Sequence, residues 1–580
     1  MNFSKKKNSI FSAAAAFLST VALWLHFRLS PSDYLIIFVY AALIALFGYS
    51  TGIKNRRGLV GAAVTGAVFA LFTVLSRLDI MSGRQSWFVF AALRFVGFAL
   101  LYTAALNIAF DFADRKLSTM LDRPREKKSL SVFFTCWAVL YLWFFLWLLY
   151  RYPGGVTIDS NLQLLQAMGK EPLSNHHPII HTAIIKVLFD LGLQLSGGDQ
   201  NFAVALYNGV QALMLSGCFA WLIESMYRQG VKKYVLLTVL AVYIVLPYHG
   251  AYSVTMWKDV WFGAVVLLLC VSLWRMICAV RLGEKFGAVD MAVFFISSLL
   301  MCLFRSNGLY AYLLFLPFVT LFILRSARKW AAVLPVLALV LAFLVKGPLY
   351  GSLGITPPDT IESLSIPAQH IARAVRDGAE LDEQQYELLS QAVDVEALAR
   401  VYSPQLSDPV KELIRHRGDQ QFIAENKAEF LRLWLELGLE NPGSYLKAQL
   451  DQTQGYWDPA VQHWVLAPDF TLSYEMELEA DCKLPEALAS LADKALELIP
   501  KLPFVSMIFS IGAGVWVFLA LLALCLVRRR YLEALVFIPH LAIWGTLLIA
   551  TPVHAEFRYI YSLFTTLPLL GILPFSRRDV

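Results

Sequence analysis

Long apolar runs recur from one end of the chain to the other, and this pattern most strongly limits the fold. The clearest runs cover residues 34–50, 58–76, 86–110, 131–150, 202–224, 257–280, 310–324 and 504–527. Weaker runs cover residues 10–29, 234–246, 291–304, 330–345, 532–550 and 560–573. Since roughly 17–25 apolar residues cross a bilayer as a helix, the runs predict about fourteen transmembrane helices. We therefore expect an all-α polytopic membrane protein.

Composition supports this class over a soluble one. Hydrophobic residues make up 58% of the chain and charged residues only 16%, whereas soluble domains carry roughly 25% charged residues. The net charge is +6, but the basic residues concentrate in short loops between the apolar runs. Nucleic acid is therefore not an expected partner.

The basic loops alternate along the chain, and this alternation predicts the topology. Lys and Arg cluster at residues 5–7, 54–57, 115–128, 228–233, 281–285, 325–329, 528–530 and 577–578. Cytoplasmic loops of membrane proteins carry such an excess of basic residues. We therefore expect a multi-pass protein of the cell membrane with both termini cytoplasmic, the loop 151–200 outside and the active site extracytoplasmic.

Four parts are expected along the chain. Residues 1–130 form a four-span membrane region, and residues 131–346 form a membrane core whose outer loop covers 151–200. Residues 347–502 contain no span and show helical periodicity, so we expect a mostly helical extracytoplasmic domain. In this domain Ser407-Asp408 before Pro409 predicts a helix start, and Asn441-Pro442-Gly443 predicts a break between two helices. Residues 503–580 close the chain with three spans.

A polar stripe is predicted in the outer loop, at positions i, i+4, i+7 and i+11 of a helix. Its members are Asp159, Gln163, Gln166 and Lys170. One interpretation is an amphipathic helix that shields the bundle at the membrane interface. The other is a catalytic helix that binds substrate through Gln163 and on which Asp159 is the general base. The periodicity alone does not decide between them.

Adjacent histidines follow in the same loop. His176 and His177 precede Pro178, and His177 lies four residues before His181. That spacing suits a metal ion, yet no Glu or Cys nearby completes a ligand set. Hydrogen bonding of His176 and His177 to a phosphate or a sugar hydroxyl is the favoured interpretation, and a divalent metal stays an open alternative.

Positive side chains also occur where spans meet the outer face. Lys258 and Asp259 begin a span, and Arg305 and Asn307 occupy a very short outer turn. Arg558 follows the last outer turn. Charges at membrane depth pair with one another or line cavities. Lys258 and Asp259 could form a structural ion pair, whereas three cations on one face predict a phosphate-binding site.

Two segments of the expected outer domain carry side chains that suit carbohydrate. Gln369 and His370 offer an amide and an imidazole, and we expect both to contact substrate. Tyr456 and Trp457 offer aromatic planes. For these two aromatic residues, ordinary packing onto the bundle is the favoured alternative.

Several motifs between residues 152 and 559 resemble those of a known superfamily. They are YPGGVTIDSNLQLLQA, NHHPIIHT, WKDVWF, RSNGLYAYLL, SIPAQHIAR and EFRY. In these motifs and in its order of parts, the chain resembles the GT-C superfamily of integral-membrane glycosyltransferases. It is most similar to an uncharacterised bacterial cell-envelope family grouped with them. The resemblance covers residues 131–580, and the first four spans fall outside it.

This resemblance implies an enzyme with a GT-C-like helical bundle. The donor would be a polyprenyl-phosphate-linked sugar, the acceptor a cell-envelope glycan, lipid or protein, and membrane lipid a further partner. Asp159 matches the acidic residue that serves as catalytic base in GT-C enzymes. Many members carry an acidic pair there, whereas this chain has Asp159-Ser160, so a requirement for a divalent metal stays open.

The candidate residues fit one reaction with such a donor. Asp159 takes the proton of an acceptor hydroxyl, and the cations Lys258, Arg305 and Arg558 stabilise the leaving phosphate. A base on the face opposite the leaving group predicts inversion. An envelope polysaccharide polymerase or ligase would share this chemistry. A transporter, the alternative of another class, would place its charges near mid-membrane between broken repeats.

Overall fold

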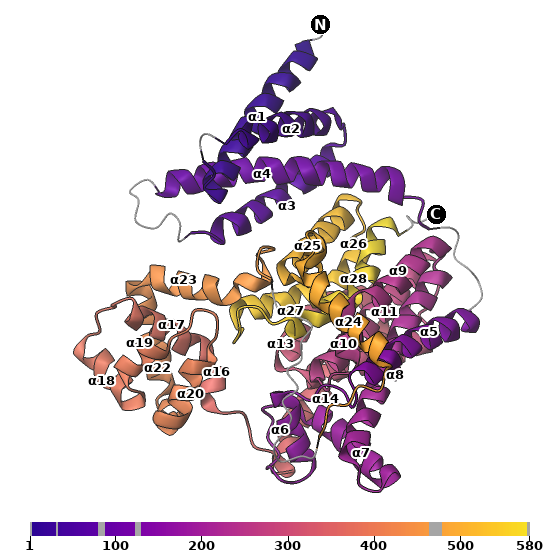
Figure 1. Ribbon diagram of the computed structural model, residues 1–580, viewed down its shortest axis with the longest axis vertical. Coiled ribbons are helices and arrows are strands. Elements are labelled where there is room, and N and C mark those ends of the chain that lie inside the picture. The colour runs from indigo at the N-terminus through magenta and orange to yellow at the C-terminus, as the bar shows by residue number, and fades with distance from the viewer. Residues whose placement is uncertain (1–2, 31–32, 79–86, 122–128, 463–477, 577–580) are drawn as a thin grey trace.

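The computed structural model describes residues 3–30, 33–78, 87–121, 129–462 and 478–576. The elements formed by the described residues are helices. These residues also form isolated β-bridges but no strand. Figure 1 shows an N-terminal group of helices at one end, a central bundle, and a separate lobe formed by the helices α16–α23. The predicted all-α class is confirmed at this level.

Many of the helices can cross a membrane. Among the helices that the structure describes, 11 are suitable by length and composition, or up to 12 if the bent pair α9 (Lys233–Val245) and α10 (Pro247–Ser253) is one span. The 11 are α1 (Phe3–Phe27), α2 (Leu35–Gly52), α3 (Arg56–Leu75), α4 (Trp87–Phe112), α5 (Leu130–Tyr150), α7 (Ile179–Ser196), α8 (Gln200–Arg228), α11 (Lys258–Arg281), α13 (Ser306–Leu324), and the segments around α14 (Val333–Leu344) and around α26 (Tyr531–Ala534) and α27 (Ile538–Ile549). Shorter helices of the bundle are α12 (Ala288–Phe304), α25 (Ile511–Val527) and α28 (Phe557–Ile572). A polytopic helical protein is therefore supported, and the number of about fourteen spans stays a prediction.

Helix α7 lies within residues 151–200, which were expected to form an outer loop. It packs antiparallel to the first turns of α8, where a Cβ on Gly192 would lie 2.4 Å from the Cα of Ala203. The side chain of Asn208 in α8 donates to the carbonyl of Pro153, just after the end of α5. The first turns of α8 therefore extend past the end of α5, and α7 covers this extension.

Helix α11 forms the centre of the bundle. It packs against α8, α12 and α28, and 78% of the residues in its most apolar stretch are buried inside the protein. Gly263 gives α28 room to approach, because a Cβ at that position would lie 3.0 Å from the ring of Tyr561. A helix that is apolar on all sides belongs in such a central position.

The N-terminal helices α1–α4 pack mainly on one another and join the bundle through one contact face. Helix α3 packs against α25 near the C-terminus. At this junction the rings of Phe69 and Trp516 stack with their centroids 4.0 Å apart. The four spans therefore pack on the last part of the chain, and residues Met120 and Leu121, which follow α4, pair with residues 231–232 between α8 and α9.

The lobe has an apolar core of its own, centred on α17 (Ser365–Arg376). Two predicted helix boundaries are confirmed there: α20 (Asp408–Arg417) begins with Pro409 in its first turn, and α22 (Lys427–Glu440) breaks from α23 (Pro442–Thr453) at Asn441. The other helices between the bundle spans are α6 (Ile158–Ala167), α15 (Tyr350–Ser352), α16 (Thr360–Ser363), α18 (Glu383–Ala392), α19 (Val395–Val401), α21 (Gln420–Glu425) and α24 (Glu486–Leu498).

Candidate active site

The start of α6 is held against the start of α11 by backbone contacts. The N–H of Gly155 donates to the carbonyl of Val254 at 2.7 Å, and the N–H of Met256 donates to the carbonyl of Gly155 at 2.8 Å. Gly154 has φ +110°, and a Cβ there would lie 2.1 Å from the amide of Asn208. Only glycine fits this turn. The turn therefore sets the position of α6 relative to α11.

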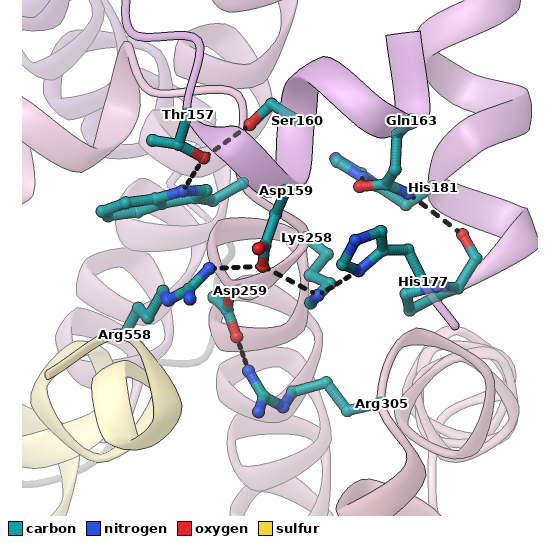
Figure 2. Close-up of polar contacts among 12 residues, drawn as sticks. Thr157, Asp159, Ser160, Gln163, His177, His181, Lys258, Asp259, Arg305 and Arg558 are labelled. Carbon is teal, nitrogen blue, oxygen red and sulfur yellow. Dashed lines mark hydrogen bonds and ion pairs between the residues drawn. The ribbon is translucent and has the colours of Figure 1, made fainter. Parts of the chain in front are cut away.

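Asp159, in the first turn of α6, is the centre of a charge cluster (Figure 2). Its Oδ2 accepts a hydrogen bond from Arg558 Nη1 at 2.6 Å and one from Lys258 Nζ at 3.2 Å. Lys258 is the first residue of α11, and Arg558 is the second residue of α28. The Asp159 side chain keeps 28% of its surface exposed. Three helix starts thus bring one carboxylate and two cations to an accessible point.

The two cations change the acidity of Asp159. Burial alone would raise the pKa of this carboxyl, but the charges of Lys258 and Arg558 hold the pKa of Asp159 well below its usual range. The group is therefore a carboxylate at neutral pH. While both cations remain paired with it, the carboxylate is also a weak proton acceptor.

His177 extends the cluster on the other side of Lys258. Its Nδ1 accepts from Lys258 Nζ at 2.8 Å, so the ring proton of neutral His177 is on Nε2. Burial and the charge of Lys258 lower the pKa of His177 to about 2. His177 is therefore a neutral hydrogen-bonding group. Its neighbour His176 is exposed, with the two ring centroids 4.6 Å apart.

A second ion pair lies beside the first. Asp259 is fully buried and contacts the guanidinium of Arg305, whose Nε donates to Asn307 Oδ1 at 3.0 Å. Lys258 and Asp259 therefore do not pair with each other. Each pairs with a residue on another element, because consecutive helix residues point in different directions. Figure 2 shows Arg305 on the side of Asp259 away from Asp159.

Aromatic rings line the two guanidinium groups, and the sequence analysis did not single them out. The Arg558 guanidinium lies 5.4 Å from the ring centroid of Trp257 and 5.3 Å from that of Tyr559. The Arg305 guanidinium lies 4.6 Å from the same Tyr559 ring. Such cation–π contacts stabilise the position of a guanidinium, which keeps its positive charge. The signal was present in part, since WKDVWF places Trp257 next to Lys258 and EFRY places Tyr559 next to Arg558.

Gln163 bonds to the first turn of helix α7. Its Oε1 bonds to His181 Nδ1 at 2.9 Å, and its Nε2 donates to Thr182 Oγ1 at 2.9 Å. The side chain is 1% exposed. The amide thus holds α6 against α7, and its role in substrate binding stays a prediction. The polar stripe also ends early, because α6 stops at Ala167 and Lys170 lies beyond it.

Gln369 and His370 lie in the lobe, away from the charge cluster. Gln369 is 0% exposed and donates to the carbonyls of Ser403 and Leu406. The ring of His370 bonds to Gln449 Oε1 at 2.9 Å and accepts from Trp434 at 3.2 Å. Both side chains are therefore used in contacts inside the protein, and their predicted contact with substrate is untested.

Metal ligation finds little support near Asp159. Within the described ranges, no group of three or more His, Cys, Asp or Glu side chains could hold a metal ion. Both ring nitrogens of His181 are engaged, one by Gln163 and the other by Tyr207 at 2.7 Å. The His177–His181 spacing therefore serves hydrogen bonds in this arrangement.

A family model matches residues 167–579, which is most of the chain. The chain belongs to DUF6020, a family of unknown function. The matched region includes His177, Lys258, Arg305 and Arg558, and it begins after Asp159. No curated protein matches the chain, and no solved structure does.

Proposed function

We propose that this protein is a membrane glycosyltransferase that moves a sugar from a polyprenyl-phosphate donor to a cell-envelope acceptor on the outer face. One observation carries the proposal. The Asp159 carboxylate contacts both Lys258 and Arg558 at the ends of bundle helices. This point combines a base with cations that suit a phosphate, next to an apolar bundle that suits a lipid chain.

The reaction needs one proton acceptor and a stabilised leaving group. The acceptor hydroxyl oxygen attacks the anomeric carbon, and its proton moves to Asp159. The bond between the anomeric carbon and the phosphate oxygen breaks, and its electrons stay on the phosphate. Lys258 and Arg558 stabilise that charge. A base on the face opposite the phosphate gives inversion, so we propose an inverting enzyme.

Donor binding would also activate the base. In the present arrangement both cations are paired with Asp159, which lowers its basicity. A donor phosphate is a second anion that competes for Lys258 and Arg558. As the cations turn to the phosphate, the carboxylate regains its basicity. Asp159 would therefore become an effective base only when the donor is present.

Arg305 has a different role in this scheme. Its guanidinium is already paired with the fully buried Asp259 and packs on Tyr559. Removing it from Asp259 would leave a buried carboxylate unpaired, which is costly. We therefore propose that Arg305 stabilises the site through its ion pair with Asp259, while Lys258 and Arg558 contact the phosphate.

The lobe and the charge cluster share one end of the bundle, which supports an extracytoplasmic site. The N–H of Asn175, two residues from His177, donates to the carbonyl of Thr356 at the start of the lobe. With the basic loops inside, this end faces outwards. The proposed location is therefore the cell membrane, with both termini cytoplasmic.

The direct test uses the purified protein in vesicles. Lipid-linked sugars from a strain that lacks the protein supply candidate donors, and envelope material supplies acceptors. The proposal expects consumption of a polyprenyl-phosphate sugar by the wild type and loss of that activity in Asp159→Asn. Consumption at the same rate by both proteins would refute the proposed role of Asp159. No consumption of any lipid-linked sugar would refute the proposed function.

A further inference from the structure

The segment 551–556 joins the lobe to the charge cluster. It connects α27 to α28 and ends two residues before Arg558. Backbone contacts hold it on one side. The N–H of Ser407 donates to the carbonyl of Pro552, and the N–H of His554 donates to the carbonyl of Gln405, both at 2.9 Å. The lobe thus pairs with this segment through residues 405–407.

Residues 452–456 hold the same segment on its other side. Gln452 Nε2 donates to the carbonyl of Thr551 at 2.8 Å, and the N–H of Gly455 donates to the carbonyl of His554 at 3.0 Å. A Cβ on Gly455 would lie 2.3 Å from the Cβ of Ala555. We refer to residues 405–407 and 452–456 together as the clamp.

Tyr456 makes the contact of the clamp that lies nearest to Arg558. Its ring is 0% exposed, and its hydroxyl oxygen accepts from Thr551 Oγ1 and from the N–H of Glu556, each at 3.2 Å. Glu556 is the residue before α28, where backbone N–H groups lack partners within the helix. The Tyr456 hydroxyl therefore fixes the point at which α28 begins.

We propose that Tyr456 is a positioning residue that sets Arg558 opposite Asp159, so that the lobe controls the geometry of the phosphate site. The role assigned to the phosphate site rests on the proposed function, whereas the positioning of Arg558 does not. Arg558 is the second residue of α28, so a shift at Glu556 moves its guanidinium. Glu556 also contacts Arg558 directly, with Oε1 3.6 Å from Nε.

Gln369 takes part in the same arrangement. Its buried amide donates to the carbonyls of Ser403 and Leu406. Leu406 belongs to the clamp, and Ser403 lies just before it in the chain. Leu406 in turn forms a β-bridge with Val553. A side chain predicted from sequence to contact sugar thus supports the segment that leads to Arg558.

The test compares two Tyr→Phe variants. Tyr456→Phe removes the hydroxyl that accepts from Glu556 and keeps the ring. Tyr445→Phe, on helix α23, is the matched control, because among the described residues the buried Tyr445 hydroxyl has no hydrogen-bond partner. Hydrogen–deuterium exchange of peptides covering 551–560 is measured in both full-length variants. We expect exchange about tenfold faster in Tyr456→Phe and unchanged exchange in Tyr445→Phe, because only the first variant leaves a buried N–H unpaired.

A second measurement is specific to Arg558. If Arg558 moves away, the pKa of Asp159 rises, so the acidic limb of kcat/KM moves to higher pH in Tyr456→Phe. A residue that only supports the fold would leave this limb in place. If Tyr456→Phe does not fold, Thr551→Val replaces it, because this variant removes the threonine hydroxyl that bonds to Tyr456. We expect the same faster exchange and the same move of the acidic limb to higher pH.

The outcomes separate this inference from the proposed function. Unchanged exchange at 551–560 overturns the inference whether or not the protein transfers sugar. Faster exchange with an unmoved acidic limb also overturns it, because the clamp then does not reach Arg558. If the wild type transfers no sugar, the proposed function fails, and the exchange experiment decides the positioning of the segment by itself.

Discussion

Arg558 and Asp159 are 399 positions apart in the chain, yet Nη1 of the one lies 2.6 Å from Oδ2 of the other. The contact joins the start of the last bundle helix to a short helix after α5. Lys258 completes it from a third helix. A carboxylate held between two cations is stable but only weakly basic. This property leads to most of the predictions below.

The first prediction concerns the base. Asp159→Asn keeps the shape of the side chain and removes the proton acceptor. We expect kcat to fall by about 10²–10⁴, because loss of a general base affects the chemical step. Donor affinity should stay the same or rise, because Lys258 and Arg558 no longer pair with a competing carboxylate. The measurement is sugar transfer in vesicles together with donor binding. Asp190→Asn is a matched control, since the Asp190 side chain is 46% exposed and pairs with Lys186 within α7. Transfer by Asp159→Asn at near the wild-type rate would remove Asp159 from the mechanism.

The second prediction concerns pH. The acidic limb of kcat/KM reports the free enzyme, and the acidic limb of kcat reports the donor complex. In the free enzyme, despite burial, Lys258 and Arg558 hold the pKa of Asp159 well below its usual range. A donor phosphate that takes these cations raises that pKa, so we expect the kcat limb at higher pH than the kcat/KM limb. Full pH profiles of both parameters provide the measurement.

Arg558→Gln tests the cause of that difference. Without this cation the pKa of Asp159 rises in the free enzyme, so the acidic limb of kcat/KM moves to higher pH and towards the kcat limb. Donor affinity should fall as well, because one phosphate contact is lost. If the kcat/KM limb stays where it is in the wild type, Arg558 does not set the acidity of the base.

The third prediction separates the two ion pairs. Asp259→Asn leaves the Arg305 guanidinium without its buried partner, and breaking such a pair costs about 3–5 kcal/mol. We therefore expect a large fall in thermal stability in detergent. Asp259→Asn combined with Arg305→Gln should regain part of it, because no buried charge is left unpaired. A strong loss of donor affinity in Arg305→Gln with unchanged stability would instead place Arg305 on the phosphate.

The fourth prediction concerns topology. Membrane-impermeant thiol reagents should label Ile158→Cys from outside and should not label Lys116→Cys, in a background without other cysteines. Both positions are exposed in the structure. In the wild type, the exposed Cys482 should also be labelled from outside. The reverse pattern would place the charge cluster on the cytoplasmic side, where the proposed acceptor is absent.

The sequence was sufficient to predict the class of the fold. Apolar runs long enough to span a bilayer must be helical, since a helix satisfies its own backbone hydrogen bonds in lipid. The helix boundaries at Pro409 and Asn441 were also readable, because proline and its neighbours set the backbone locally. Asp159, Lys258 and Arg558 could be selected as candidates, because charged residues at the ends of spans are costly unless they pair with one another or line a cavity.

Only the tertiary structure decided which residues meet. Lys258 and Asp259 are neighbours in sequence but have separate partners, and Gln163 turns its amide to His181 rather than to the cluster. Gln369 supports a turn of the lobe instead of lying beside Asp159. Local patterns place a side chain on a helix face, but ion pairs depend on how distant helices pack. That packing is the sum of many contacts, such as Gly263 against Tyr561, which no short motif encodes.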